Sequence, residues 1–219
     1  WKIQNIVNIA ENDSMPKSVS DVLGFVVPRG KYSLVLVVRD AKNPNLNKTI
    51  NETVVIQPVR SAKFSISDIE IARNIKSDGA DQKSLFYKNS LEVFPNPTMA
   101  FTHQSPVMFY YAELYNLKLD DEKTEFSLRK NLYNSSGIPV YRNTKNVKQA
   151  KQAVVEYGVV NLAKYPTDSY SFELSLVDPA TNQAFVSAKR FYLYNPNVVD
   201  TNRSTNINAG VIGSEFGLY

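Results

Sequence analysis

Cysteine is absent from this sequence, and histidine, glycine and long hydrophobic runs are scarce. Without cysteine, the chain can form no disulfide, no thiolate metal site and no thiol nucleophile. No apolar run reaches the roughly 18 residues that a membrane-spanning helix needs, so we expect no transmembrane segment in this chain. The glycine-rich phosphate-binding patterns are missing as well, which excludes the common nucleotide-cofactor loops.

Residues that commonly carry catalysis or bind metals are few and poorly placed. The single histidine, His103, lies in a polar turn, and no Gly-x-Ser-x-Gly pattern supplies a nucleophile for it. The acidic run Asp120–Glu122 lacks the spaced oxygen ligands of a calcium-binding loop. We therefore predict no catalytic residue, no metal site and no cofactor, and we interpret the chain as non-enzymatic.

The charge is mildly positive, with 25 lysines and arginines against 21 acidic residues and a net charge of +4. The lysines are scattered along the chain. A nucleic-acid-binding surface is instead typically a dense basic stripe interleaved with aromatic residues. We therefore expect no nucleic-acid partner.

One segment occurs twice and indicates the domain organisation. Tyr32–Asp40 reads YSLVLVVRD, and Tyr170–Asp178, 138 residues later, reads YSFELSLVD. Tyrosine, serine, leucine and aspartate coincide, and the apolar residues alternate in the same phase, as in a strand with one buried face. Each copy follows a proline-containing turn. The repeat therefore predicts two domains that each contain this strand.

Alternation with a period of two recurs along the chain, whereas helical periodicity is nearly absent, which predicts an all-β protein. The expected strands lie near Ile3–Ile9, Val22–Val27, Tyr32–Arg39, Thr53–Gln57, Lys63–Ala72, Leu91–Phe94, Val107–Tyr115, Glu125–Leu132, Val154–Asn161, Tyr170–Val177 and Phe185–Tyr194. The last seven fit an antiparallel sandwich of the immunoglobulin or fibronectin-III type.

We predict two tandem immunoglobulin-like or fibronectin-III-like β-sandwiches, of which the first is incomplete at its N-terminal side. Residues 1–60 are the C-terminal part of the first sandwich, 61–195 form the second, and 196–219 are an extended connecting tail. The second domain has about 108 residues ahead of the repeated strand and the first only 31. Half a sandwich exposes its core and its strand edges. Either chain before Trp1 or a strand donated by another polypeptide would complete it.

Four residues are candidates for an interaction surface. Val35 and Val37 occupy outward positions where the second copy has Glu173 and Ser175. These valines indicate either a domain or partner contact, or simply the preference of valine for strands. Neighbouring residues of a strand face opposite sides, so either Tyr110 or Tyr111 faces outward, where it could stack on a sugar or a peptide. The alternative is that tyrosine suits sheet surfaces in general.

Three motifs, taken in their order, resemble a known family. The run Phe64–Ala72 (FSISDIEIA) precedes Phe94–Pro97 (FPNP), and Tyr110–Asn116 (YYAELYN) follows. This order resembles the bacterial proteins named for a GWxTD domain, over roughly Val27–Tyr219. The naming motif Gly-Trp-x-Thr-Asp is itself absent, so the resemblance is to a central region of such proteins. It implies a secreted or envelope-associated protein of β-sandwich modules, and it carries over no catalytic residue.

The leading functional hypothesis is therefore a non-enzymatic structural or protein-interaction module with an extracytoplasmic location. It would act through sheet edges and apolar strand faces, with another protein or a second copy as its partner. Two alternatives stay open at this point. One is a glycan- or peptide-binding module that uses surface tyrosines, and the other is a spacer attached to an enzyme domain elsewhere in the parent protein.

Overall fold

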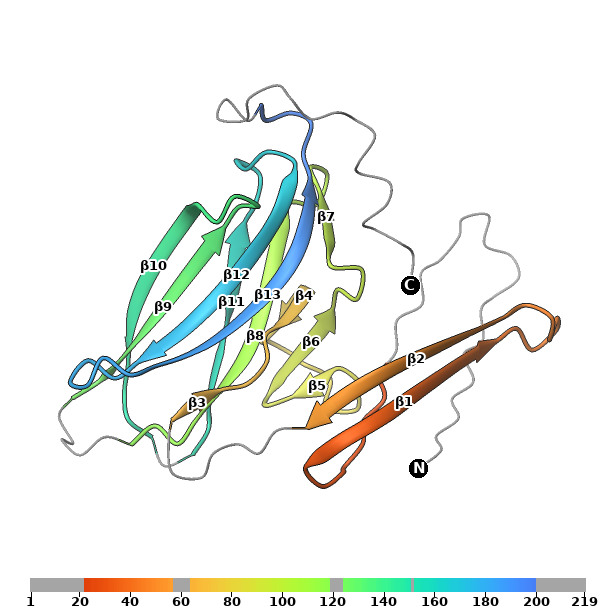
Figure 1. The fold of residues 1–219 in the computed structure, drawn as a ribbon, viewed down its shortest axis with the longest axis horizontal. Coiled ribbons are helices and arrows are strands. Elements are labelled where there is room, and N and C mark those ends of the chain that lie inside the picture. The colour runs from red at the N-terminus through yellow and green to blue at the C-terminus, as the bar shows by residue number, and fades with distance from the viewer. Residues whose placement is uncertain (1–21, 57–63, 119–123, 151, 200–219) are drawn as a thin grey trace. The chain divides into compact units, whose positions relative to one another are not determined.

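The computed structural model describes residues 22–56, 64–118, 124–150 and 152–199, and all regular structure in these ranges is β-strand. The chain divides into two compact units, a hairpin within residues 25–56 and a larger unit within residues 64–199 (Figure 1). The described ranges contain no helix of the length and apolarity needed to span a bilayer. The prediction of an all-β protein is confirmed.

The larger unit is a sandwich of two facing sheets (Figure 1). The first, which we call the β12 sheet, has the order β10–β9–β12–β13–β7. Its strands are β10 (Pro139–Val147), β9 (Phe126–Tyr133), β12 (Asp168–Val177), β13 (Ala184–Tyr194) and β7 (Ala100–Thr102). All neighbours pair antiparallel except β13 and β7, which are parallel.

The second sheet, the β8 sheet, has the order β11–β8–β4–β6–β5, and the short β3 also pairs with β8. Its strands are β11 (Val154–Asn161), β8 (Val107–Tyr115), β4 (Glu70–Lys76), β6 (Leu91–Pro95), β5 (Tyr87–Lys88) and β3 (Ser65–Ile66). All these pairs are antiparallel.

The core lies between β8 and β12, whose alternate residues point toward each other. The inward residues are Met108, Tyr110, Ala112 and Leu114 on β8, and Tyr170, Phe172, Leu174 and Leu176 on β12, each at most 2% exposed. The ring centroids of Tyr110 and Phe172 are 4.7 Å apart. Burial of one face of each strand is the physical reason for the alternation seen in the sequence.

The smaller unit is the antiparallel hairpin of β1 (Gly30–Arg39) and β2 (Asn47–Ile56). The bounds of β1 and β12 differ by 138 residues at both ends, so the sequence repeat is also a repeat of structure. The Tyr32 hydroxyl donates a hydrogen bond to the Pro28 carbonyl at 2.6 Å, and the Tyr170 hydroxyl donates one to the Pro166 carbonyl at 2.8 Å. In both copies the tyrosine therefore anchors the strand to the turn before it.

The shared aspartate closes both hairpins in a similar way. The Asp40 N–H donates to the Leu46 carbonyl at 3.0 Å, and the Asp178 N–H donates to the Gln183 carbonyl at 2.9 Å. Each carboxylate also accepts a backbone N–H two residues further on, as is usual for aspartate in turns. The tyrosine and the aspartate of the repeat thus mark the two ends of one strand.

Some strand predictions were wrong. The structure has no strand at Val22–Val27, where the apolar run ends at a proline that lacks the N–H of a ladder donor. Lys63–Ala72 was expected to be one strand, but its described part contains the short β3 and the start of β4. Strand β10 was missed because most of its residues are polar and exposed. The strand expected at Ile3–Ile9 and the predicted linker near Pro58–Ala62 lie outside the described residues, as does the connecting tail beyond Val199.

The tyrosine anchor leads to a stability prediction. Tyr170→Phe removes the hydrogen bond to the Pro166 carbonyl and should lower the free energy of unfolding by about 1 kcal/mol. Urea denaturation followed by far-UV circular dichroism measures this. The control is Tyr157→Phe, at a ring that is 46% exposed, where we expect a change within about 0.5 kcal/mol. Equal losses in both variants would show that the anchor contributes nothing specific.

Candidate functional sites

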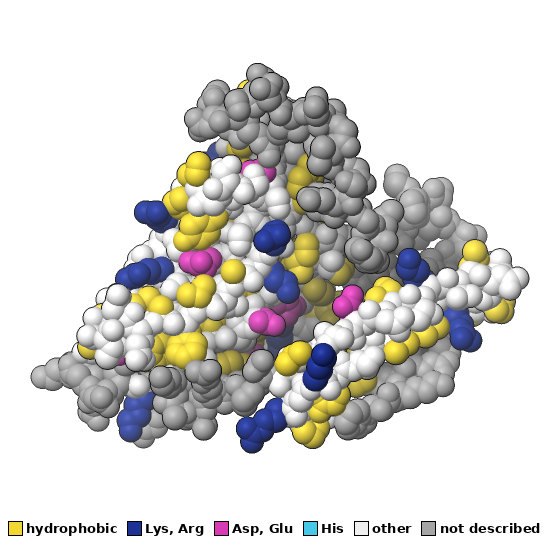
Figure 2. Space-filling view, viewed as in Figure 1, with side chains coloured by type: hydrophobic (Ala, Val, Ile, Leu, Met, Phe, Trp, Pro, Cys, Tyr) yellow, Lys and Arg dark blue, Asp and Glu magenta, His cyan; other side chains and the backbone are white. Residues whose placement is uncertain are grey.

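Both faces of the β1–β2 hairpin are apolar and exposed. Val35 and Val37 are 57% and 45% exposed, and on the opposite face Leu34 and Leu36 are 40% and 37% exposed. Figure 2 shows hydrophobic side chains along the hairpin. Exposure alone therefore does not distinguish Val35 and Val37 from Leu34 and Leu36 on the opposite face.

The equivalent strand β12 shows how such a strand is covered inside a sandwich. Its inward residues are buried in the core, and β9 pairs with it along the edge that is not paired with β13. On its outward side, Glu173 accepts hydrogen bonds from Asn131 at 3.0 Å and from Tyr133 at 3.4 Å. Ser175 is also on this outward side, yet it is only 7% exposed, because it lies between Arg129 and Val186 of the neighbouring strands.

Tyr110 points into the sandwich and is 2% exposed, so it offers no stacking surface. Its hydroxyl lies 3.0 Å from Glu156 Oε1 and 3.2 Å from Lys130 Nζ. Lys145 Nζ approaches Glu156 Oε2 to 2.5 Å, and Lys130 Nζ lies 3.5 Å from Oε1. Burial, together with the neighbouring Glu156 carboxylate, raises the pKa of Tyr110 far above its usual value.

This buried cluster joins the two sheets. Glu156 belongs to β11, at one edge of the β8 sheet, and both lysines belong to β9 and β10 of the β12 sheet. The Glu156 side chain is 2% exposed, so removing its partners would leave a buried charge uncompensated. The cluster has the geometry of a structural ion network that closes this side of the sandwich.

Gly158 is required by the same cluster. It pairs with Tyr110 across β11 and β8, and a Cβ atom at this position would lie 2.6 Å from the Tyr110 hydroxyl oxygen. That distance is too short for any side chain, so the tyrosine reaches Glu156 only over a glycine.

Tyr111 faces outward, as the strand alternation predicted for one of the two tyrosines, but it is only 3% exposed. It packs with Ala72, Leu91 and Val93 in a second, smaller apolar cluster on the outer face of the β8 sheet. Lys88 Nζ lies 4.1 Å from its ring centroid. Neither predicted tyrosine therefore presents a free ring to a glycan or a peptide.

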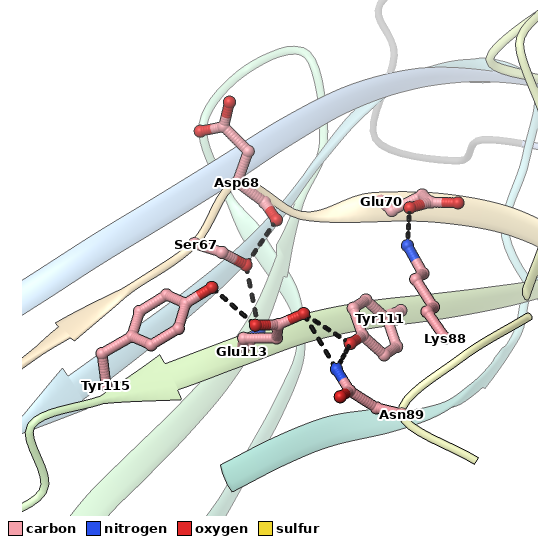
Figure 3. Close-up of polar contacts among 8 residues, drawn as sticks. All are labelled: Ser67, Asp68, Glu70, Lys88, Asn89, Tyr111, Glu113 and Tyr115. Carbon is pink, nitrogen blue, oxygen red and sulfur yellow. Dashed lines mark hydrogen bonds and ion pairs between the residues drawn. The ribbon is translucent and has the colours of Figure 1, made fainter. Parts of the chain in front are cut away.

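A polar network surrounds Tyr111, and Glu113 is at its centre (Figure 3). The Glu113 carboxylate accepts hydrogen bonds from the Tyr111 hydroxyl at 2.7 Å, the Tyr115 hydroxyl at 2.6 Å and the Asn89 side chain at 3.0 Å. Its backbone N–H donates to the Ser67 hydroxyl at 2.9 Å. One glutamate thus ties together β8, the segment before β4 and the β5–β6 turn.

Asn89 holds the β5–β6 turn over this face. Asn89 and Ser90 have φ angles of 47° and 65°, the left-handed pair that a two-residue hairpin of type I′ needs. The Asn89 amide also contacts the Tyr111 hydroxyl at 2.5 Å, and the adjacent Lys88 pairs with Glu70 of β4. The turn is therefore fastened to the sheet on both sides of Tyr111.

Electrostatics keep the network in one protonation state. Burial would raise the pKa of Glu113, but the hydrogen bonds that its carboxylate accepts and the nearby Lys88 charge lower the pKa below the usual 4.5. Burial and the bond to Glu113 raise the pKa of Tyr115 to about 12. At neutral pH the carboxylate is charged and the hydroxyl protonated, which suits a structural clamp better than a general base.

Of the other residues weighed for chemistry, the structure describes His103, which has no catalytic partner beside it. His103 lies beside Tyr194, with ring centroids 6.2 Å apart, and its buried Nδ1 atom makes no hydrogen bond. Within the described ranges, no three His, Cys, Asp or Glu side chains are arranged to hold a metal ion. The acidic run Asp120–Glu122 lies outside the described residues.

No protein-family model matches the chain, and no curated protein matches it. Two structures of a β-glucuronidase from Parabacteroides merdae, one with glycerol in its active site, match 67% of this chain at 10–11% identity with a TM-score of 0.33. The match spans only 14–15% of the glucuronidase chain.

The Glu113 network predicts a pH effect. Because the folded pKa of Glu113 lies below 4.5, the charged carboxylate stabilises the fold above that pH, and the stabilisation is lost as the pH falls through the folded pKa. The difference in unfolding free energy between the unsubstituted chain and Glu113→Gln should therefore be largest near neutral pH and shrink in acid. Urea denaturation at several pH values measures it. Glu125→Gln, outside the network, is the control, and an identical curve from it would contradict the assignment.

The contact at Gly158 gives a separate prediction. Gly158→Ala forces the Tyr110 hydroxyl away from Glu156 and should destabilise the sandwich by about 1–3 kcal/mol. In the Tyr110→Phe background, which removes the atom nearest the new Cβ, the same substitution should cost less. Urea unfolding of the four chains gives the coupling directly. Additive effects would show that the two residues do not compete for this space.

Proposed function

We propose that this chain is a non-enzymatic structural or protein-interaction module of a secreted or envelope-associated bacterial protein. In this proposal, immunoglobulin-like sandwiches follow one another along the chain, and the module acts through sheet edges and apolar strand faces. The observation that carries the proposal is the hairpin β1–β2, which repeats β12–β13 and yet exposes Val35 and Val37 on its outward side. Single surface valines need no explanation, but these two share one strand face on which the equivalent strand β12 carries Glu173 and Ser175.

The immunoglobulin-like assignment rests on the tyrosine anchor. In such sandwiches, a tyrosine near the start of a late strand bonds back to the backbone a few residues upstream. Tyr170 and Tyr32 both do this, to carbonyls four residues earlier. Two copies of this feature support an array of like modules.

The motifs that resemble the GWxTD-named proteins support a structural role. The serine of the first motif, Ser67, accepts a hydrogen bond through its hydroxyl from the backbone N–H of Glu113 in the last motif. In the proposal, these motif residues fasten strands together, and the envelope or extracellular location follows from the resemblance.

Cross-linking tests the role of the outward valines. A photoreactive benzoylphenylalanine at position 37, in the full-length protein within its native cells, should yield a discrete cross-linked product that mass spectrometry identifies. The same residue at Thr144, on the exposed outer face of β10, is the matched control and should give no such product. Absence of a product from position 37, or equal products from both positions, would contradict the proposal.

A further inference from the structure

The two faces of the β1–β2 hairpin differ in what they carry. Cross-strand pairing places six residues on one side, which we call the inner face: Tyr32, Leu34, Leu36, Val38, Ile50 and Val54, interrupted by Glu52 and Lys48. On the other side, Val35 and Val37 face Asn51 and Thr49. The inner face is the more apolar one, although its leucines are still 37–40% exposed.

In the sandwich, the residues equivalent to those of the inner face are core residues. Tyr32 occupies the place of Tyr170, and Leu34, Leu36 and Val38 occupy those of Phe172, Leu174 and Leu176, all at most 1% exposed. The second strands of the two hairpins, β2 and β13, are equivalent as well. Val54 pairs with Tyr32 as Phe191 pairs with Tyr170, and charged Glu52 takes the position of charged Lys189. The equivalence therefore extends across both strands.

In the sandwich, the equivalent hairpin β12–β13 is covered in two ways. Strand β9 pairs antiparallel along β12, from Tyr133 opposite Ser171 to Ser127 opposite Val177. The inward residues of β8, including Tyr110, pack over the apolar face. A two-stranded hairpin without such cover is marginally stable in water.

We propose that β1–β2 is the closing hairpin of a further β-sandwich, and that its inner face is covered by strands of the same polypeptide that precede the hairpin. One of these strands pairs antiparallel with β1, in the place that β9 takes on β12. A second sheet covers Tyr32, Leu34, Leu36 and Val38, as β8 covers their equivalents.

The order of strands in the sandwich identifies the same polypeptide as the source. Every strand that covers β12–β13, from β3 to β11, comes before that hairpin in the chain. A repeated fold with the same order places the covering strands before β1. The inference rests on the tandem architecture proposed above, but it concerns the inner face, whereas cross-linking at position 37 tests the outer face.

Hydrogen–deuterium exchange on the full-length native protein tests the inference. The alternate amides of β1 that point away from β2 should be protected, as the equivalent amides of β12 are, and β12 serves as the internal reference. Protection should not depend on protein concentration, and the protein should be monomeric by light scattering. Unprotected amides would overturn the inference, and so would protection that disappears on dilution of a dimer, since a second copy would then supply the cover.

Two neighbouring substitutions test the assignment of the faces. Leu36→Asp places a charge on the inner face and should speed exchange of the β1 amides about tenfold or more, because the covered state is lost. Val37→Asp places the same charge on the outer face and should leave that protection in place. Equal effects would overturn the assignment, and unchanged exchange in β12 shows that the rest of the protein remains folded.

Discussion

The facing of β8 and β12 is the constraint on which the rest of the sandwich depends. Each strand has one apolar face that must be removed from water, and the two faces cover each other through contacts such as that between Tyr110 and Phe172. A tyrosine in this position brings a hydroxyl into the core, and a buried hydroxyl needs a partner. Glu156 supplies it, Gly158 leaves room for it, and the two lysines balance the buried charge.

Side chains on the outer faces of the two sheets are also shielded from water, but by different contacts. On the β8 sheet, the β5–β6 hairpin is fastened by Asn89 to Tyr111 and Glu113, so a ring that points outward is still buried. On the β12 sheet, the outer side of β12 is lined by side chains of its neighbouring strands, which bury Ser175. The hairpin β1–β2 has neither arrangement among the described residues, and this contrast motivates both proposals made for it.

Local patterns predicted much of this fold. The period-two alternation located β8, β9, β11, β12 and β13, and the repeat identified a strand that recurs, as β1 and β12, with the same tyrosine and aspartate contacts. Strand β10 was missed because it lies at a sheet edge, where polar residues are tolerated and the alternation fades. Part of the Glu113 network could be recognised in the sequence, since Tyr111, Glu113 and Tyr115 share one face of a strand. Its other members, Ser67 and Asn89, are distant in the chain.

The sequence by itself determined the all-β class, the opposite orientation of Tyr110 and Tyr111, and the equivalence of the two repeated strands, because these follow from the geometry of a single strand. Only the tertiary structure decided that both tyrosines are buried, that Ser175 is covered, and that Glu156 and Glu113 are the centres of two networks. These features depend on which strands lie beside or above one another, and contacts between residues 20 to 46 positions apart leave no periodic trace in a single sequence.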